Sequence, residues 1–112
     1  FPSYYEPWGY TPLECLASGV PSITSDLSGF GDYVASNIPD HREKGMYIAR
    51  RRNRSFDQAS EEMTNTMFDF VQQSRRERIA LRNKCEEASL TFDWQNLRRF
   101  YDNAYEEANR MP

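Results

Sequence analysis

The chain has 112 residues, 38% of them hydrophobic, which is enough for one small domain but short for a two-domain enzyme with its own cleft. Its net charge of -3 and its aromatic content of 14% argue against a disordered protein. We find no secretory signal segment and no apolar run near the roughly 18 residues that a membrane span needs. We therefore expect a cytoplasmic protein without membrane association.

Charge is unevenly distributed along the chain. Residues 1–41 carry five acidic residues but no Lys or Arg. Most basic residues fall in two later clusters, Arg50, Arg51, Arg52 and Arg54, and then Arg75, Arg76, Arg78, Arg82 and Lys84. Such clusters can attract phosphate groups, although a solvated charged face is the commoner explanation. Because the whole chain is acidic, we do not expect nucleic acid as a partner.

The first 24 residues predict a strand, a helix and a second strand. We expect residues 1–3 to end a strand, and because the sequence starts there without Met, we expect a fragment of a longer protein. Residues 4–10, YYEPWGY, contain Pro and Gly and predict a loop. Thr11 is then a candidate helix cap, with Pro12 in the first turn and Glu14 completing a T-x-x-E capping box.

Gly19 is placed to end this helix, and VPSIT at residues 20–24 predicts a second strand, parallel to the first. Residues 25–33 predict a glycine-bearing loop, in which Ser28, Gly29 and Gly31 either close over a ligand or form a simple turn. Residues 45–49, GMYIA, predict a third strand.

The rest of the chain predicts helices. Ser55 is a candidate cap for a helix reaching about residue 74, residues 75–89 carry an i, i+4, i+7 apolar stripe, and Asp93 can cap a last helix. We divide the chain into an α/β part at residues 1–54 and a helical part at 55–112. The last helix carries the aromatic residues Trp94, Phe100, Tyr101 and Tyr105, which we interpret as packing anchors and not as a sugar-stacking platform.

Three other residues have no assigned chemistry. Cys15 and Cys85 lie in predicted helices at a separation that fits neither a zinc nor a redox motif, so we expect free buried thiols. His41 is the single histidine and has no second ligand at metal-binding spacing. We expect no metal or other cofactor.

The first loop carries the strongest functional signal. In open α/β sheets ligands bind at the carboxyl ends of strands, and the N–H groups at a helix start attract anions. The amides of Gly9, Tyr10 and Thr11 are therefore candidates for a phosphate, flanked by Glu6 and Glu14, whose carboxylates can accept hydrogen bonds from sugar hydroxyls. This arrangement suits a sugar nucleotide.

The spacing of the two glutamates leaves an alternative open. Glu14 can be only the acid of a capping box, Glu6 a solvent-facing loop residue, and Trp8 a core side chain. The spacing alone does not decide between the two interpretations.

The segment FPSYYEPWGYTPLECLASGVPSITSDLSGFG closely resembles the active-site segment of animal and fungal glycogen synthases, glycosyltransferase family 3. The similarity continues through RRNRSFDQ, FVQQSRRERIALRN and FDWQNLRRFYDNA, and so covers nearly the whole chain. It implies the carboxyl-terminal part of the second Rossmann-like, parallel-sheet domain of a GT-B glycosyltransferase, followed by carboxyl-terminal helices. A fragment of this size is expected to be inactive alone.

The resemblance also implies a reaction. Glycogen synthases transfer glucose from a nucleotide sugar, UDP-glucose in animals and fungi, to the 4-hydroxyl end of an α-1,4-glucan with retention of configuration. By position, Glu6 is the implied catalytic-site carboxylate at the donor glucose, and Glu14 the ribose ligand. The main chain of Trp8, Gly9, Tyr10 and Thr11 is implied to contact the sugar and the distal phosphate. UDP-glucose and ADP-glucose stay open as donors, because the residues that bind the base are not in this chain.

The arginine-rich helix has a counterpart in the family, where it binds the activator glucose 6-phosphate. Arg75, Arg78 and Arg82 share one helical face, with Arg76 beside it. Lys84 and Glu86 stand where the family has later arginines, which thins the positive face. A solvated helix or a subunit interface, and hence a homo-oligomer, are the alternatives. Two rival functions are a noncatalytic sensor of sugar phosphates and a helical interaction module.

Overall fold

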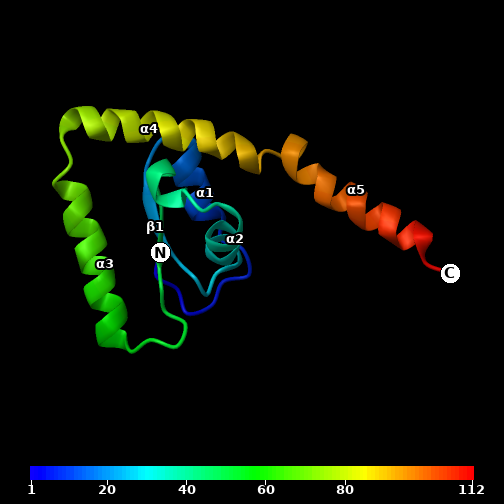
Figure 1. Ribbon diagram of the computed structural model, residues 1–112, viewed down its shortest axis with the longest axis horizontal. Coiled ribbons are helices and arrows are strands. Elements are labelled where there is room, and N and C mark those ends of the chain that lie inside the picture. Colours follow the sequence, from blue (N-terminus) through cyan, green and yellow to red (C-terminus); the bar gives the residue numbers. More distant parts are fainter.

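The computed structural model describes residues 1–112 and is a mixed α/β fold that is mostly helical (Figure 1). Its elements are α1 (Tyr10–Ala17), β1 (Ser22–Ser25), α2 (Gly29–Asn37), the 3-10 helix η1 (His41–Lys44), β2 (Met46–Ala49), α3 (Phe56–Val71), α4 (Arg75–Ser89), the 3-10 helix η2 (Leu90–Phe92) and α5 (Trp94–Arg110). None of the helices combines the length and the apolar character that crossing a membrane requires.

The sheet has two parallel strands, β1 and β2, paired from Ser22 opposite Met46 to Ser25 opposite Ala49. Both strands were predicted, but the prediction of a strand at residues 1–3 is wrong. Pro2 has no N–H to donate, and Ser3 N turns back to Phe1 O at 2.9 Å. A single bond from Phe1 N to Ile23 O, 2.7 Å, ties this segment to β1.

The predicted glycine loop at residues 25–33 is mostly the helix α2. Ser28 caps it, because the Ser28 hydroxyl accepts a hydrogen bond from Gly31 N at 3.0 Å. The Ser28 hydroxyl also donates to Ser25 O at 2.8 Å, so the end of β1 and the start of α2 form one hydrogen-bonded turn. Neither a lid nor a simple turn describes this segment.

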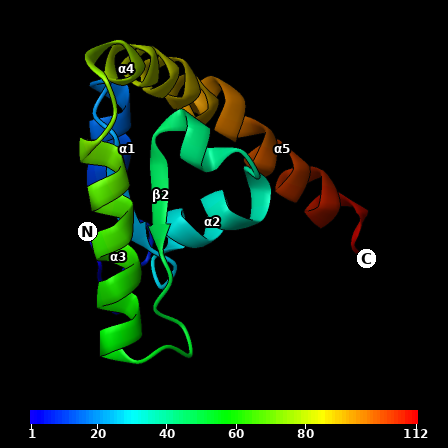
Figure 2. The ribbon, with the colours of Figure 1, turned by 60° about the vertical axis from the view of Figure 1, so that its left-hand side comes forward.

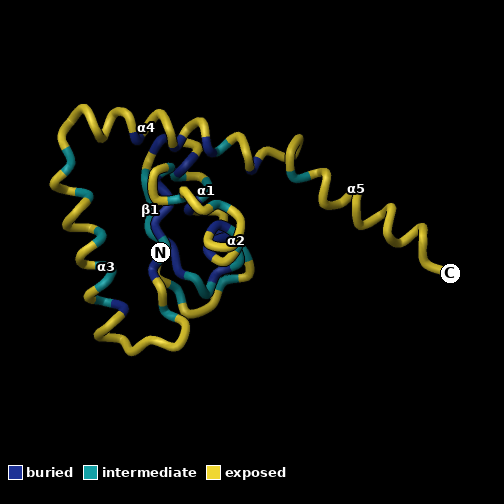
Figure 3. The backbone as a smooth tube through the Cα atoms, in the orientation of Figure 1, coloured by how far each residue is buried: buried dark blue, intermediate teal, exposed yellow.

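The core lies where α4 crosses α1 and the sheet edge. Its members are buried apolar side chains from both parts of the chain: Leu16, Phe30, Val34, Met46, Leu81, Cys85, Ala88 and Phe92. The three α4 residues of the predicted i, i+4, i+7 stripe are all among them. Figure 3 shows the buried segments gathered in this body, whereas α3 and α5 are largely exposed.

The long helices begin where the sequence predicts. Ser55 with Gln58 and Ser74 with Glu77 form complete capping boxes, and the Asp93 side chain accepts a hydrogen bond from Gln95 N at 3.0 Å. In the turned view α3 runs beside β2, while α4 passes over α1 (Figure 2).

The aromatic residues of α5 do not pack as the sequence predicts. No residue of α5 is buried, and Trp94 and Tyr105 are 63% and 68% exposed. α5 points away from the body of the fold (Figure 1), so most of its apolar side meets no other element. Phe100 touches Tyr33 at 6.4 Å between ring centroids, and Trp94 pairs with Tyr101 within the helix at 5.8 Å.

Candidate functional site

The loop of residues 4–9 is fastened to the carboxyl edge of the sheet. Glu6 forms an isolated parallel bridge with Ser28, in which Gly29 N donates to Glu6 O at 3.0 Å. Two residues on, Phe30 N donates to Trp8 O at 2.8 Å. A side chain at Gly29 would overlap the carbonyl of Pro7, so only glycine permits this approach. The loop is thereby held in one position by main-chain bonds.

Helix α1 starts earlier than the sequence predicts. Gly9 occupies the N-cap position at φ 104, and α1 begins at Tyr10 without any side-chain cap. The left-handed conformation, which glycine adopts readily, brings the chain into the helix before Thr11. The predicted Thr11 cap and its capping box with Glu14 are therefore wrong.

The early start leaves hydrogen-bonding groups free at this end of α1. No side chain accepts a bond from the first-turn amides of Tyr10 and Thr11, and Pro12 has no N–H. Glu14 is exposed and its carboxylate is not used for capping. The interpretation of Glu14 as a capping acid is thus excluded, and the helix start presents unpaired amides together with a free carboxylate.

The Glu6 carboxylate lies against Gly9. Its Cδ atom is 3.3 Å from the place that a Cβ at Gly9 would take, which is a tight contact. Glu6 is half-buried and makes no side-chain hydrogen bond or ion pair. Glu6 in the turn and Glu14 in α1 therefore carry unpaired carboxylates on either side, along the chain, of the free amides.

The Trp8 side chain packs against neighbouring aromatic rings. Its ring meets Phe30 edge-on at 5.6 Å between centroids and Tyr33 at 5.9 Å. Only the main chain of Trp8 is left to face a ligand. Tyr10, by contrast, is 67% exposed, and Thr11 is exposed as well.

The arginines of α4 are all exposed, but two are engaged locally. The Arg78 guanidinium donates to Val71 O at 2.6 Å and lies 5.6 Å from the centre of the Phe70 ring. Arg82 pairs with Glu86 at 3.5 Å, a contact that partly offsets its charge. Arg75 and Arg76 have no ion-pair partner in the structure.

The remaining polar side chains form no metal centre. The structure contains no cluster of three His, Cys, Asp or Glu residues that could hold a metal ion. His41 Nδ1 is bonded to Met46 O at 2.6 Å, which ties η1 to β2. Both cysteines are free. Cys85 is fully buried, and burial, aided by the charge of Glu86, raises the pKa of its thiol from 9.0 to about 11. Cys15 is only half-buried, contrary to the expectation.

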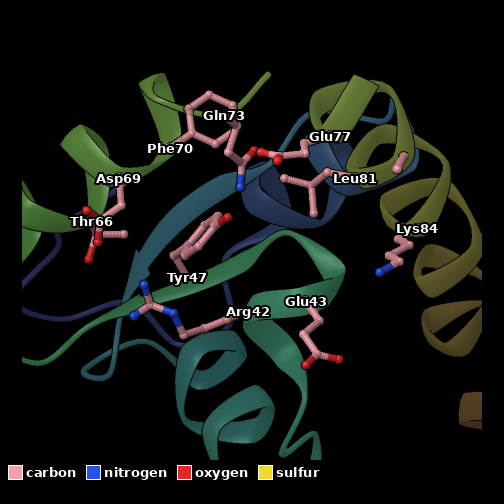
Figure 4. A pocket seen from close by; sticks show the side chains of 11 residues that line it. Arg42, Glu43, Tyr47, Thr66, Asp69, Phe70, Gln73, Glu77, Leu81 and Lys84 are labelled. Atoms are coloured by element: carbon pink, nitrogen blue, oxygen red, sulfur yellow. The ribbon is translucent and has the colours of Figure 1, made fainter. Parts of the chain in front are cut away.

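A cavity of about 410 Å³ lies on another side of the fold, between η1, β2, α3 and α4 (Figure 4). The Arg42 guanidinium stands 5.3 Å from the centre of the Tyr47 ring there, while Glu43, Asp69 and Lys84 complete a rim of mixed charge. Burial raises the pKa of Tyr47, and the charge of Arg42 opposes that rise. No residue of the first loop lines this cavity.

Sequence reasoning missed how the first loop is anchored. Asp26 follows β1 and the cluster at residues 50–54 follows β2, and the Asp26 carboxylate accepts a bond from Arg51 N at 2.9 Å. The available signal was positional, since residues that follow neighbouring parallel strands meet at one sheet edge.

Comparison with known proteins agrees with the family resemblance noted in the sequence. The glycogen synthase family model matches residues 1–111. The chain is 50% identical to glycogen [starch] synthase of Caenorhabditis elegans over 101 residues, which are 90% of this chain and 15% of that protein. It is 48% identical to the human liver glycogen [starch] synthase over 104 residues, 93% of this chain and 15% of the relative.

The fungal relative is equally similar. Glycogen [starch] synthase of Neurospora crassa is 47% identical over 110 residues, which cover 98% of this chain and 16% of that protein. This chain therefore spans only 15% to 16% of the length of the relatives it matches. From the family match over nearly every residue and the identity to animal and fungal enzymes, we conclude that the chain belongs to the glycogen synthase family.

Proposed function

We propose that this chain is part of a retaining glucosyltransferase that moves glucose from UDP-glucose to the 4-hydroxyl end of an α-1,4-glucan. One observation carries the proposal: in a chain of the glycogen synthase family, the turn into α1 has free amides and two unpaired carboxylates, Glu6 and Glu14. ADP-glucose is the alternative donor. The relatives named above are glycogen [starch] synthases, which supports a nucleotide-sugar donor and a glucan acceptor.

Each group at the turn has a proposed role. The amides at Gly9, Tyr10 and Thr11 bind the distal phosphate of the donor, where the positive end of the helix dipole of α1 favours negative charge. Glu14 accepts hydrogen bonds from the ribose hydroxyls. Glu6 accepts them from the glucose hydroxyls near the reacting carbon, and the main chain at Trp8 contributes to the same sugar site. The chemistry we propose uses no metal ion.

The proposed reaction is a front-face displacement. The bond between the anomeric carbon and the phosphate oxygen breaks, and the acceptor 4-oxygen bonds to that carbon from the same side. The acceptor proton passes to the departing phosphate. The protein's contribution is to position the reactants and to stabilise developing charge, which requires a loop that is rigid before the substrate arrives. The bonds from Gly29 N and Phe30 N to the loop carbonyls supply that rigidity.

We further propose that the two strands belong to a larger Rossmann-like sheet, in the second domain of a GT-B enzyme that acts in the cytoplasm. The parallel pairing of β1 and β2, and a ligand loop at their carboxyl edge, support this assignment. The residues that would neutralise the diphosphate and bind the acceptor lie outside this chain, so residues 1–112 alone are expected to be inactive.

The test is Glu6→Ala in the full-length enzyme. We expect turnover to fall at least about 100-fold, a loss of about 2.7 kcal/mol of transition-state stabilisation, while the melting temperature stays near that of the parent. The matched control is Glu43→Ala, which removes an exposed carboxylate in η1 away from the loop. Near-normal turnover of the Glu6 variant would refute the assignment of this site.

A regulatory site for glucose 6-phosphate on α4 is a second part of the proposal. The shared exposed face of Arg75, Arg78 and Arg82, with Arg76 beside it, supports it. Replacing the three facing arginines by Ala should abolish activation by glucose 6-phosphate and leave activity without the effector unchanged. Undiminished activation of the triple variant would exclude this face as the glucose 6-phosphate site. A contact between subunits of a homo-oligomer would then be its proposed role.

A further inference from the structure

Two loops meet at the carboxyl edge of the sheet, and both bear on Glu6. Ser25 at the end of β1 lies opposite Ala49 at the end of β2. Asp26 comes directly after the first strand, and the arginine cluster of residues 50–54 directly after the second. The segment that leads to Glu6 starts beside β1, since Phe1 N donates to Ile23 O at 2.7 Å.

Asp26 fixes the main chain of the arginine cluster. One of its carboxylate oxygens accepts hydrogen bonds from Arg51 N at 2.9 Å and from Arg52 N at 3.3 Å. Asp26 N in turn donates to Ala49 O at 3.2 Å. The Arg51 backbone is therefore held in a set position relative to both strands.

The Arg51 side chain extends from this anchor to the segment that precedes Glu6. Its guanidinium donates to Pro2 O and lies 3.7 Å from the centre of the Tyr4 ring, a close cation–π contact. The other arginines of the cluster differ. Arg50 and Arg54 pair with Glu62 at 4.0 and 2.8 Å, and the exposed Arg52 side chain makes no hydrogen bond or ion pair.

Glu6 thus lies between two anchors. On its carboxyl side, Gly29 N holds the Glu6 carbonyl at 3.0 Å. On its amino side, a single residue separates it from Tyr4, and the Tyr4 ring rests on Arg51. Tyr4 and Tyr5 are 69% and 80% exposed, so no core packing holds this stretch in the absence of Arg51.

We propose that Arg51 is a positioning residue of the donor site, which sets the Glu6 carboxylate over Gly9 by holding Pro2 and Tyr4 against the end of β2. Arg51 acts through the loop and does not itself touch the substrate. The inference rests on the proposed function. It predicts a defect in the reacting geometry at Glu6, whereas the contacts of Glu14 and the α1 amides with the nucleotide stay intact.

The experiment compares variants of the full-length enzyme in steady-state kinetics with the nucleotide-sugar donor. Arg51→Ala should lower kcat by roughly 10- to 100-fold, the range that a displacement of about 1 Å at a reacting group can cause, and change the donor KM by less than about 3-fold. Arg52→Ala is the matched control, because it removes a neighbouring charge without a side-chain contact. Its kcat should stay within about 2-fold of the parent.

A second variant removes the contact from the other side. Tyr4→Leu should reproduce the kcat loss of Arg51→Ala, while Tyr4→Phe, which keeps the ring, should retain activity. Because both residues form one contact, the double variant Arg51→Ala with Tyr4→Leu should lose about as much as either single variant. Should Arg51→Ala fail to fold, the two Tyr4 variants decide the question.

Three outcomes would overturn the inference. Arg51→Ala could have the same kcat as Arg52→Ala, or the kcat losses of the two single variants could multiply in the double variant. In the third, Arg51→Ala raises the donor KM while kcat stays constant. Glu6→Ala, assayed alongside, separates this failure from failure of the proposed function. If Glu6→Ala abolishes turnover and the Arg51 and Tyr4 variants do not, only the positioning role is refuted.

Discussion

The α/β part of the chain, residues 1–54, and the last helix, α5, have similar shares of large apolar side chains but opposite packing. Fourteen of the 19 buried residues lie in residues 1–54, whereas α5 has none. From the first part, Leu16, Phe30, Val34 and Met46 pack in one core with buried side chains of α4. The comparison teaches that an apolar stripe predicts a helix reliably, but that burial depends on whether another element covers the stripe.

The largest expected effect tests this difference directly. Leu16 is fully buried in α1, so Leu16→Ala should lower the free energy of unfolding of this chain by about 2 to 5 kcal/mol. Tyr105→Ala on the outlying α5 should cost less than about 1 kcal/mol, because Tyr105 is 68% exposed and little of its surface is removed from water. Urea unfolding measures both. Equal losses would show that α5 is packed as tightly as α1.

A smaller effect is expected where the first loop approaches α2. Gly29→Ala should destabilise the chain by about 1 to 3 kcal/mol, because the added methyl group overlaps the Pro7 carbonyl and forces the loop outward. Ala35→Ser, an exposed change on the same helix, should stay within about 0.5 kcal/mol. Thermal unfolding compares the two variants, and similar melting temperatures would contradict the close approach.

Helix caps should contribute equally in the two parts, since they act locally. Ser74→Ala, which breaks the capping box of α4, should cost about 1 kcal/mol. Ser28→Ala at the start of α2 should cost the same or slightly more. Ser36→Ala, an exposed position inside α2, serves as the control with a change below about 0.5 kcal/mol. A much larger loss for Ser74 would mean that α4 depends on its cap more than on its core contacts.

Near neutral pH the smallest effect on stability concerns the Cys85 thiol, whose titration matters only at high pH. The pKa of the Cys85 thiol is raised by burial from 9.0 to about 11, so its contribution to stability is complete below pH 9 and is lost as the pH rises toward 11. At pH 8 a thiol reagent should label Cys15 well before Cys85 in the native chain. Labelling rates followed by mass spectrometry test this order, and equal rates would indicate that α4 detaches from the core.

Much of the secondary structure was predictable because its determinants are local. Ser55 and Asp93 mark two helix starts through their own side chains, and the structure has a helix beginning after each. Gly19 ends α1 in the same local way, with Val20 N bonded to Cys15 O at 2.8 Å. The apolar stripe at Leu81, Cys85 and Ala88 was enough to identify the buried face of α4.

The failed predictions have both local and long-range causes. Thr11 has the neighbours of a capping box, but Gly9 takes the left-handed conformation and the helix starts before it. The glycines of residues 25–33 predicted a loop, whereas the close approach of Pro7 to Gly29 and of Ser25 to Gly31 is what requires them. The approach of Pro7 to Gly29 is invisible in the sequence, because no local pattern connects the first loop with the start of α2.

The sequence by itself determined the family, the candidate residues of the first loop and the starts of α3, α4 and α5, since these depend on residue identity and on spacing within a few turns. Tertiary structure decided which groups are free to act. It released Glu14 from capping, packed the Trp8 ring against the core and brought Arg51 to Tyr4 across 47 positions. The physical reason is that hydrogen bonds and packing between parallel strand ends join segments that no local pattern connects.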